Sequence, residues 1–219
     1  MKEPLIRSRT VGEYRVQVYL VSCPKTERGV IIDPAGQPRR LARWAQQENV
    51  TVTHILCTHG HPDHTLAAAE LRRLLGAPLA LHAADDDFFA SPAGARVARG
   101  ELGLVPPPRA DLRLADGDEI VVGELTIKVL HTPGHTPGGV CYLAGKNLFT
   151  GDTLFVGAVG RTDLGGASLD TLLTSLRDKV LPLPGDTVIW PGHDYGDTPT
   201  STLAREKEEN PYITDFLMD

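Results

Sequence analysis

The chain has 219 residues, of which 41% are hydrophobic and 23% are charged, which is ordinary for a globular protein with a sizeable core. Its net charge of −6 gives no sign of the basic face typical of nucleic-acid-binding proteins, so we expect no nucleic-acid partner. Residues 1–20 carry charges throughout and no apolar run reaches the roughly 20 residues of a membrane span, which favours a cytoplasmic protein without a membrane partner.

Strands and helices alternate along the first part of the chain. Period-two alternation or short apolar runs predict strands, and apolar residues at helical spacing predict helices. The predicted strands cover residues 14–21, 29–34, 54–57 and 79–83, and the predicted helices cover residues 38–50 and 64–78. Gly76 is a suitable C-cap for the second helix. This alternation predicts an α/β fold built in layers.

The second part of the chain returns to strands and helices after an irregular segment. Residues 83–110 are acidic, then basic, then proline-rich, and we expect a surface excursion with a short helix and a lid. The later predicted strands cover residues 118–131, 139–152 and 187–194, and the later helices cover 168–180 and about 200–210. No linker or internal repeat divides the sequence, so we expect a single domain over residues 1–219.

The segment "CTHGHPDH", residues 57–64, holds three of the eight histidines of the chain and one aspartate. It follows a predicted strand and precedes a predicted helix, so it is anchored at both ends. His59 and His61 point to the same side of an extended segment, whereas Asp63 and His64 follow Pro62 and can face another point. One loop could thus serve two adjacent ions. Imidazole with carboxylate suits zinc or iron better than magnesium or calcium.

Three further candidate ligands lie at the ends of later strands. His135 lies in "HTPGHTPGG", Asp152 in "FTGDTLF" and His193 in "IWPGHDYG". Ligands gather at strand ends in α/β folds, so we expect these side chains to join the first cluster. The remaining histidines are expected to have structural roles: His54, His82 and His131.

Taken together, "THGHPDH", "PGHTPG", "TGDTLF" and "PGHDYG", in this order, resemble the metallo-β-lactamase superfamily of metallohydrolases. The resemblance covers nearly the whole chain. It implies a four-layer αβ/βα sandwich, an α/β fold in which two central sheets are flanked by helices and the metals lie at one edge. The implied ligands of the first metal are His59, His61 and His135, those of the second are Asp63, His64 and His193, and Asp152 bridges the two.

Within the superfamily, "GDTLFVGAVGR" resembles the glyoxalase II (hydroxyacylglutathione hydrolase) group. This resemblance implies a thioester hydrolase with two Zn²⁺ ions, or Fe or Mn in their place, in which a metal-bound hydroxide attacks the substrate carbonyl. The implied catalytic residues are Asp63 and Asp152. Arg161 and Tyr195 match positions that contact glutathione, so the implied substrate is a small anionic thioester or glutathione conjugate. The alternative is that Arg161 is a surface arginine beside Asp163 and Tyr195 a packed aromatic.

Two departures leave the substrate open. Glyoxalase II proper adds a C-terminal helical domain that completes its glutathione site, and the few residues after "ENPYI" do not provide one, so a smaller or different thioester is an alternative. The persulfide dioxygenase branch is the second alternative, because "GRTDL" and the C-terminal "HDYGDTPTSTLAREKEENPYI" resemble it. In that branch His59, His135 and Asp152 would hold a single Fe(II). The segment 83–110, which is shorter there, favours the hydrolase.

Other classes fit less well. β-Lactamases of the superfamily usually lack the bridging aspartate, so Asp152 argues against them. Non-catalytic binding modules on this scaffold normally lose ligands, and all seven positions are filled here. Members of the superfamily often dimerise, so the resemblance also allows a homodimer.

Overall fold

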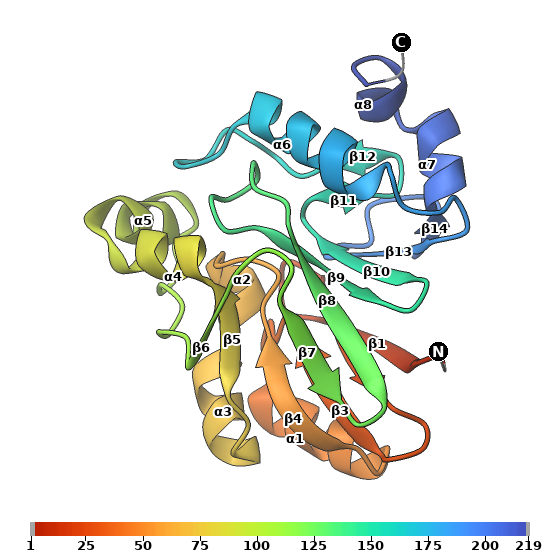
Figure 1. The fold of residues 1–219 in the computed structure, drawn as a ribbon. Helices are drawn as coiled ribbons and strands as arrows, with labels where there is room; N and C mark the ends of the chain where they lie inside the picture. Colours follow the sequence, from red (N-terminus) through yellow and green to blue (C-terminus); the bar gives the residue numbers. More distant parts are fainter. Residues whose placement is uncertain (1–2, 218–219) are drawn as a thin grey trace.

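Two six-stranded sheets face each other at the centre of the molecule, and helices cover the outer side of each (Figure 1). The computed structural model describes residues 3–217. The first sheet holds, in spatial order, β1 (Leu5–Val11), β2 (Val16–Ser22), β3 (Arg28–Ile32), β4 (Thr51–Leu56), β5 (Leu79–His82) and β6 (Leu112–Leu114). The second holds β14 (Ser201–Thr202), β13 (Val188–Pro191), β10 (Asn147–Gly151), β9 (Val140–Ala144), β8 (Leu125–His131) and β7 (Glu119–Val122). A short ribbon pairs β11 (Leu154–Phe155) with β12 (Ala158–Val159).

The helices form the two outer layers. α1 (Pro38–Gln47) and α3 (Ala68–Leu75) lie at the bottom of Figure 1, on the first sheet. The helices on the second sheet are α6 (Leu169–Ser175) with its π-helical continuation η2 (Leu176–Val180), α7 (Leu203–Glu209) and α8 (Pro211–Thr214). A single turn, α2 (Pro62–Thr65), precedes α3. These layers confirm the four-layer αβ/βα sandwich.

Strand alternation explains how one sheet serves two cores. All seven residues of β2 are buried. Leu20 packs with Leu41 and Trp44 in the core between the first sheet and its helices. Tyr19 and Val21 point the other way, into the core between the two sheets. Successive side chains on a strand face opposite sides, so a continuous apolar run such as β2 is what a strand between two layers requires.

β1 is a strand that the sequence pattern does not predict. It lies at the edge of the first sheet, where it pairs only with β2. Most of its side chains are exposed or half-buried. An edge strand of this kind can be polar, so it lacks the apolar alternation on which strand prediction depends.

Residues 83–110, the predicted surface excursion with a short helix, are mostly exposed or half-buried but hold more regular structure than the sequence predicts. They begin with α4 (Ala83–Ala90), α5 (Pro92–Arg96) and the π-helical turn η1 (Val97–Glu101). Asp85 and Asp86 of α4 are buried, and Phe89 and Val97 form a small apolar core with neighbouring side chains. Because carboxylates occupy much of the buried face of α4, the sequence of this helix predicts an exposed segment. The predicted lid function stays a prediction.

The strand directions bring the candidate ligands to one edge. β3, β4 and β5 are parallel, and β8, β10 and β13 share one direction in the second sheet. His59 therefore follows the carboxyl end of β4, His135 that of β8, Asp152 that of β10 and His193 that of β13. The carboxyl ends of parallel strands are where α/β folds bind ligands.

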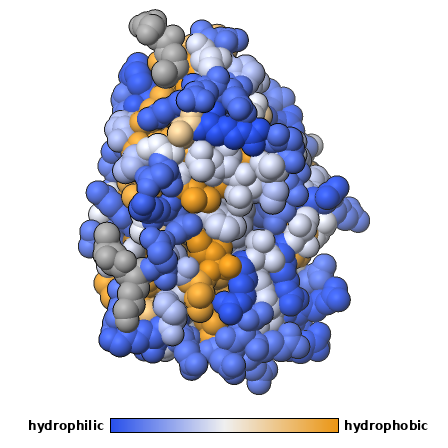
Figure 2. Space-filling model, turned by 90° about the vertical axis from the view of Figure 1, so that its right-hand side faces the viewer, coloured by the Kyte–Doolittle hydropathy of each residue, from blue (hydrophilic) through white to orange (hydrophobic). Residues whose placement is uncertain are grey.

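The molecular surface is mostly hydrophilic on the side that lies at the right in Figure 1. Apolar residues form a narrow strip in the middle and lower part of that face and smaller patches at its upper left (Figure 2). Over residues 3–217, no helix is both long enough and apolar enough to cross a bilayer. The expected homodimer stays a prediction.

Candidate metal centre

All seven candidate ligands meet at the strand-end edge. Their donor atoms form three overlapping groups, and within each group the atoms lie within 4.8 Å of one another. The groups are His59, His61 and His135; His59, His64 and Asp152; and Asp63, His64 and His193. The structure therefore brings together the residues that the sequence singles out.

The first group consists of three imidazoles. His61 Nδ1 lies 2.8 Å from His135 Nε2, and the His59 ring centroid lies 4.9 Å from that of His61 and 4.8 Å from that of His135. His59 Nε2 is buried and has no hydrogen-bond partner. Three ring nitrogens thus converge on one point.

Asp63, His64 and His193, which we call the second group from here on, combine two imidazoles with a carboxylate. His64 Nε2 lies 3.2 Å from His193 Nε2. Asp63 Oδ2 lies 3.6 Å from the first of these nitrogens and 3.7 Å from the second. This donor set includes a carboxylate, which the first group lacks.

Asp152 lies between the two groups. Its Oδ1 is 3.4 Å from His64 Nε2, and its Oδ2 is 3.5 Å from both His135 Nε2 and His193 Nε2. One carboxylate therefore contacts a histidine of the first group and both histidines of the second. This is the position that a bridging ligand requires.

Hydrogen bonds to the second ring nitrogen fix the orientation of three histidines. His64 Nδ1 lies 3.0 Å from Asp33 Oδ2. His135 Nδ1 lies 2.8 Å from the backbone carbonyl oxygen of Arg161, and His193 Nδ1 lies 2.9 Å from that of Tyr14. A carbonyl can only accept, so in the latter two the proton is on Nδ1 and Nε2 keeps its lone pair for a metal. Sequence analysis missed Asp33, although its place after the strand "VII" matches that of the ligands.

The electrostatics of the site favour cations. Burial and the neighbouring imidazoles lower the pKa values of His59 and His61 well below the usual value, which keeps both neutral. Burial also opposes protonation of His64, but the carboxylates of Asp152, Asp63 and Asp33 outweigh it and raise the pKa of His64 to about 10. This part of the site therefore attracts positive charge strongly.

The buried polar atoms agree with a metal centre. Within residues 3–217, His59 Nε2 and Asp152 Oδ1 are the buried side-chain nitrogen and oxygen atoms without a hydrogen-bond partner, and both belong to the cluster. Buried polar groups are otherwise almost always paired. A side chain at Gly192 would clash with Asp152 Oδ1, so a glycine keeps the space beside this oxygen open. The residues present thus fit metal ions bound by imidazole and carboxylate.

Comparison with known proteins places the chain in a family. A family model described as the metallo-beta-lactamase superfamily matches residues 11–193. The chain belongs to this superfamily. A curated relative is hydroxyacylglutathione hydrolase GloC of Haemophilus influenzae, which is 33% identical over 85% of this chain and 88% of its own. Another is human mitochondrial persulfide dioxygenase ETHE1, which is 30% identical over 90% of this chain and 70% of its own.

Solved structures of the superfamily share the fold. The crystal structure of BLEG-1 B3 metallo-beta-lactamase has a TM-score of 0.86 and 32% identity, covering 96% of this chain and 100% of that one. TTHA1623, solved in a di-iron-bound form, has a TM-score of 0.80 and 36% identity, covering 94% of this chain and 99% of that one. The metallo-β-lactamase fold is thus shared, and TTHA1623 binds two irons in it, whereas the names of the relatives span several activities.

A cavity of about 120 Å³ opens onto this superfamily site. Arg161 and Tyr195 both line it, as do five of the seven candidate ligands. The Tyr195 ring stacks on the His193 ring at 4.8 Å and is 65% exposed. Arg161 is engaged by Asp163, because its Nε and Nη2 donate to the two carboxylate oxygens at 2.7 Å each. The Arg161 side chain is therefore at the cavity but already paired.

Apolar side chains that the sequence did not single out form one wall of the cavity. Leu102 and Leu104, from the segment after η1, line it together with Leu164 and Tyr14. The Tyr14 hydroxyl donates to the Leu102 carbonyl at 3.5 Å, which links the β1–β2 turn to this segment. No local pattern marks these residues, because they become neighbours only in the folded chain.

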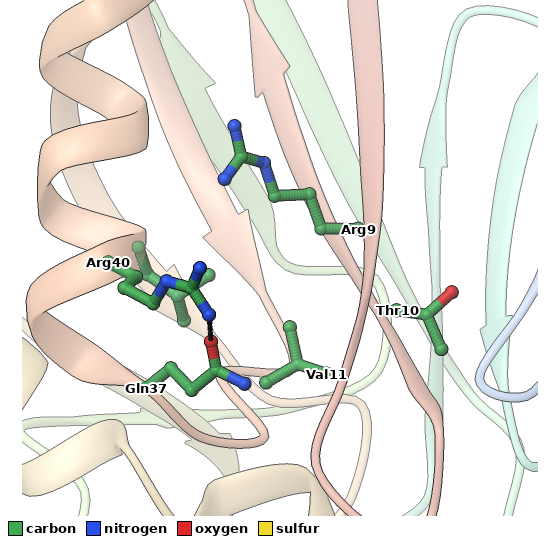
Figure 3. Close-up of a pocket in the computed structure, with 6 residues that line it drawn as sticks. Arg9, Thr10, Val11, Gln37 and Arg40 are labelled. Atoms are coloured by element: carbon green, nitrogen blue, oxygen red, sulfur yellow. Dashed lines mark hydrogen bonds between the residues drawn. The ribbon is translucent and has the colours of Figure 1, made fainter.

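A wider hollow of about 300 Å³ lies between β1 and α1. Arg9, Gln37 and Arg40 line it, and Arg40 Nη1 donates to Gln37 Oε1 at 2.8 Å (Figure 3). It is lined by no histidine, cysteine or carboxylate among the described residues. Its chemistry is therefore unlike that of the metal centre, although its volume is larger.

Proposed function

We propose that the protein is a binuclear metallohydrolase of the glyoxalase II type that cleaves the thioester of an anionic thiol. The observation that carries this proposal is the position of Asp152 between two complete sets of donors. The relationship to GloC, which is named a hydroxyacylglutathione hydrolase, supports the thioester class.

The seven side chains divide into two metal sites in this proposal. His59, His61 and His135 would hold the first ion, Asp63, His64 and His193 the second, and Asp152 both. Zinc ions bound there would act as Lewis acids and lower the pKa of water towards about 7. Iron or manganese would suit the same donors.

The protein supplies positioning and proton handling. Asp63 lines the cavity, so its carboxylate can accept a hydrogen bond from the attacking water and direct a lone pair at the thioester carbonyl. Asp152 keeps the two sites at a fixed separation, because it contacts histidines of both. The apolar wall of Leu102, Leu104 and Leu164 would exclude bulk water from the acyl group.

The substrate proposal depends on Arg161 and Tyr195 at the cavity rim. A guanidinium binds a carboxylate through two parallel hydrogen bonds, so a substrate carboxylate would take the place of Asp163 on Arg161. The exposed face of Tyr195 offers a surface for the thiol moiety. A small-molecule partner, rather than nucleic acid or a membrane, fits these contacts.

The decisive experiment measures metal content and activity on the same purified sample. We expect about two metal ions per chain and hydrolysis of a hydroxyacylglutathione thioester. Two bound metals without thioester cleavage would contradict the thioester assignment, and turnover of a β-lactam instead would point to an activity like that named for BLEG-1.

A second candidate function is persulfide dioxygenation, which the relationship to human ETHE1 favours. In that case His59, His135 and Asp152 would hold one iron. Oxygen uptake with glutathione persulfide, together with one iron per chain, would establish this alternative and exclude the hydrolase.

A further inference from the structure

Asp85 is a fully buried carboxylate outside the set of candidate ligands. It lies in the first turn of α4, directly after β5, and its exposed fraction is 0%. It does not line the cavity. A buried carboxylate is costly unless hydrogen bonds or charges compensate it, so its partners indicate what it does.

The carboxylate of Asp85 joins two loops that carry metal ligands. Its Oδ2 accepts hydrogen bonds from Gly60 N–H at 2.7 Å and from the Thr136 hydroxyl at 2.8 Å. Its Oδ1 accepts one from Gly138 N–H at 2.5 Å. Gly60 separates His59 from His61, and Thr136 directly follows His135. One side chain therefore ties together the segments that carry the three histidines of the first group.

Close packing supports the same link. A Cβ at Gly138 would clash with the backbone nitrogen and the carboxylate of Asp85. A Cβ at Gly60 would clash with the ring of Phe89, which is also on α4. Both loops thus approach α4 so closely that only glycine fits, and α4 acts as a common support for them.

The charge of Asp85 also matches what the first group lacks. Burial raises the pKa of Asp85, but two of its three partners are backbone N–H groups, which can only donate and which reach both oxygens, so they favour the ionised carboxylate. No lysine or arginine forms an ion pair with it in the part of the chain that the structure describes. The three histidines of the first group carry no negative charge of their own, so a nearby carboxylate would favour a cation there.

We propose that Asp85 is a positioning residue for the first metal site, which fixes the His59–His61 loop against the His135 loop. The inference rests on the proposed division into two metal sites and not on the identity of the substrate. Groups that orient metal ligands typically change metal affinity about 10–100-fold when they are removed.

Asp86 provides a matched control. It is adjacent on the same helix and is 3% exposed. Its carboxylate accepts hydrogen bonds from Arg109 Nη2 at 2.7 Å and Ala110 N–H at 3.0 Å. Neither partner belongs to a metal loop. Asp86→Asn therefore changes an equally buried carboxylate without touching the loops.

The test measures Zn²⁺ affinity by calorimetric titration of metal-free protein in two backgrounds. His193→Ala leaves the first site intact, and His61→Ala leaves the second. We expect Asp85→Asn to weaken Zn²⁺ binding about 10–100-fold in the His193→Ala background and to leave it unchanged in the His61→Ala background. Asp86→Asn should change neither affinity. An equal loss of Zn²⁺ affinity in both backgrounds, or no loss in the His193→Ala background, would overturn the proposal.

A milder variant covers the case in which Asp85→Asn does not fold. Thr136→Val removes one donor to Asp85 and keeps the side-chain shape, so it should weaken only the first site, by a smaller factor. An unchanged first site would then overturn the proposal. If the parent protein bound no Zn²⁺ at all, the metal centre itself would be wrong, which is a separate outcome.

Discussion

At the scale of single residues, the backbone orients metal ligands at the positions whose side chains we propose as substrate contacts. Arg161 orients His135 through its backbone carbonyl, which any residue at that position provides. Only its guanidinium, now paired with Asp163, is available for substrate. The same holds for Tyr14, whose carbonyl accepts from His193 while its ring lines the cavity. Side-chain substitutions at these positions should therefore affect substrate binding and not metal binding.

Arg161→Ala tests this separation. We expect KM for an anionic thioester to rise about tenfold, as the loss of one charged hydrogen-bonding group predicts, with kcat and metal content nearly unchanged. Asp163→Asn is the control, since it weakens the competing pair and should leave KM equal or lower. An unchanged KM in Arg161→Ala would remove this residue from the substrate site.

Asp152→Ala tests the bridging ligand. Loss of a carboxylate that contacts both groups should lower metal content below two ions per chain and reduce activity by more than about 100-fold. Plasma emission analysis and a steady-state assay on the same sample measure both effects. Full metal content with full activity would show that Asp152 does not bridge.

At the scale of elements, the start of α4 depends on a neutral histidine. His82 Nδ1 accepts a hydrogen bond from Ala84 N–H at 3.2 Å and thereby caps the helix. Its ring stacks on that of His131 at 3.9 Å. Burial and the imidazole of His131 lower the pKa of His82 to about 4, although the carboxylates of Asp116 and Asp118 act in the opposite direction. This histidine has the structural role that its sequence context predicts.

The depressed pKa of His82 predicts a pH-dependent stability. In the unfolded chain a histidine has a pKa of about 6.5, so below this pH the unfolded state binds more protons than the folded state. His82 therefore disfavours folding increasingly as the pH falls from about 6.5 to about 4. His82→Asn keeps a capping acceptor and does not titrate. In thermal melts between pH 7 and 4.5, the melting temperature of the parent protein should fall more than that of this variant as the pH is lowered. An equal fall in both proteins would contradict the prediction.

At the scale of the whole molecule, two buried tyrosines join the sheets beside the metal centre. The Tyr19 hydroxyl of β2 donates to the Pro191 carbonyl of β13 at 2.6 Å. The Tyr142 hydroxyl of β9 donates to the Cys57 carbonyl after β4 at 2.8 Å. Both acceptors lie two residues before a candidate ligand, so these bonds hold the two ligand-bearing edges together.

Tyr142→Phe and Tyr19→Phe measure this connection. Each leaves a buried carbonyl without its partner, so the free energy of unfolding should fall by about 1–3 kcal/mol. The exposed Tyr212 is the control, and its replacement by Phe should change stability by less than about 0.5 kcal/mol. Urea unfolding of the metal-free proteins measures these free energies. An equal loss of unfolding free energy in all three variants would contradict the role of Tyr19 and Tyr142.

The sequence alone determined the layered α/β fold and the seven candidate ligands. Apolar periodicity is local, and each ligand lies within a short motif at a strand end, so both can be read without coordinates. The buried, polar face of α4 and the exposed edge strand β1 were not predictable in this way, because their burial depends on neighbours distant in the chain.

Only the tertiary structure decided what holds the ligands in place. Asp33 contacts His64 across 31 positions, Asp85 reaches Gly138 across 53, and the Tyr14 carbonyl meets His193 across 179. Local propensity carries no information about contacts at such separations, since they form only when the two sheets pack together. Short local motifs thus determine which side chains can bind metal, whereas the packing of the two sheets determines their relative positions.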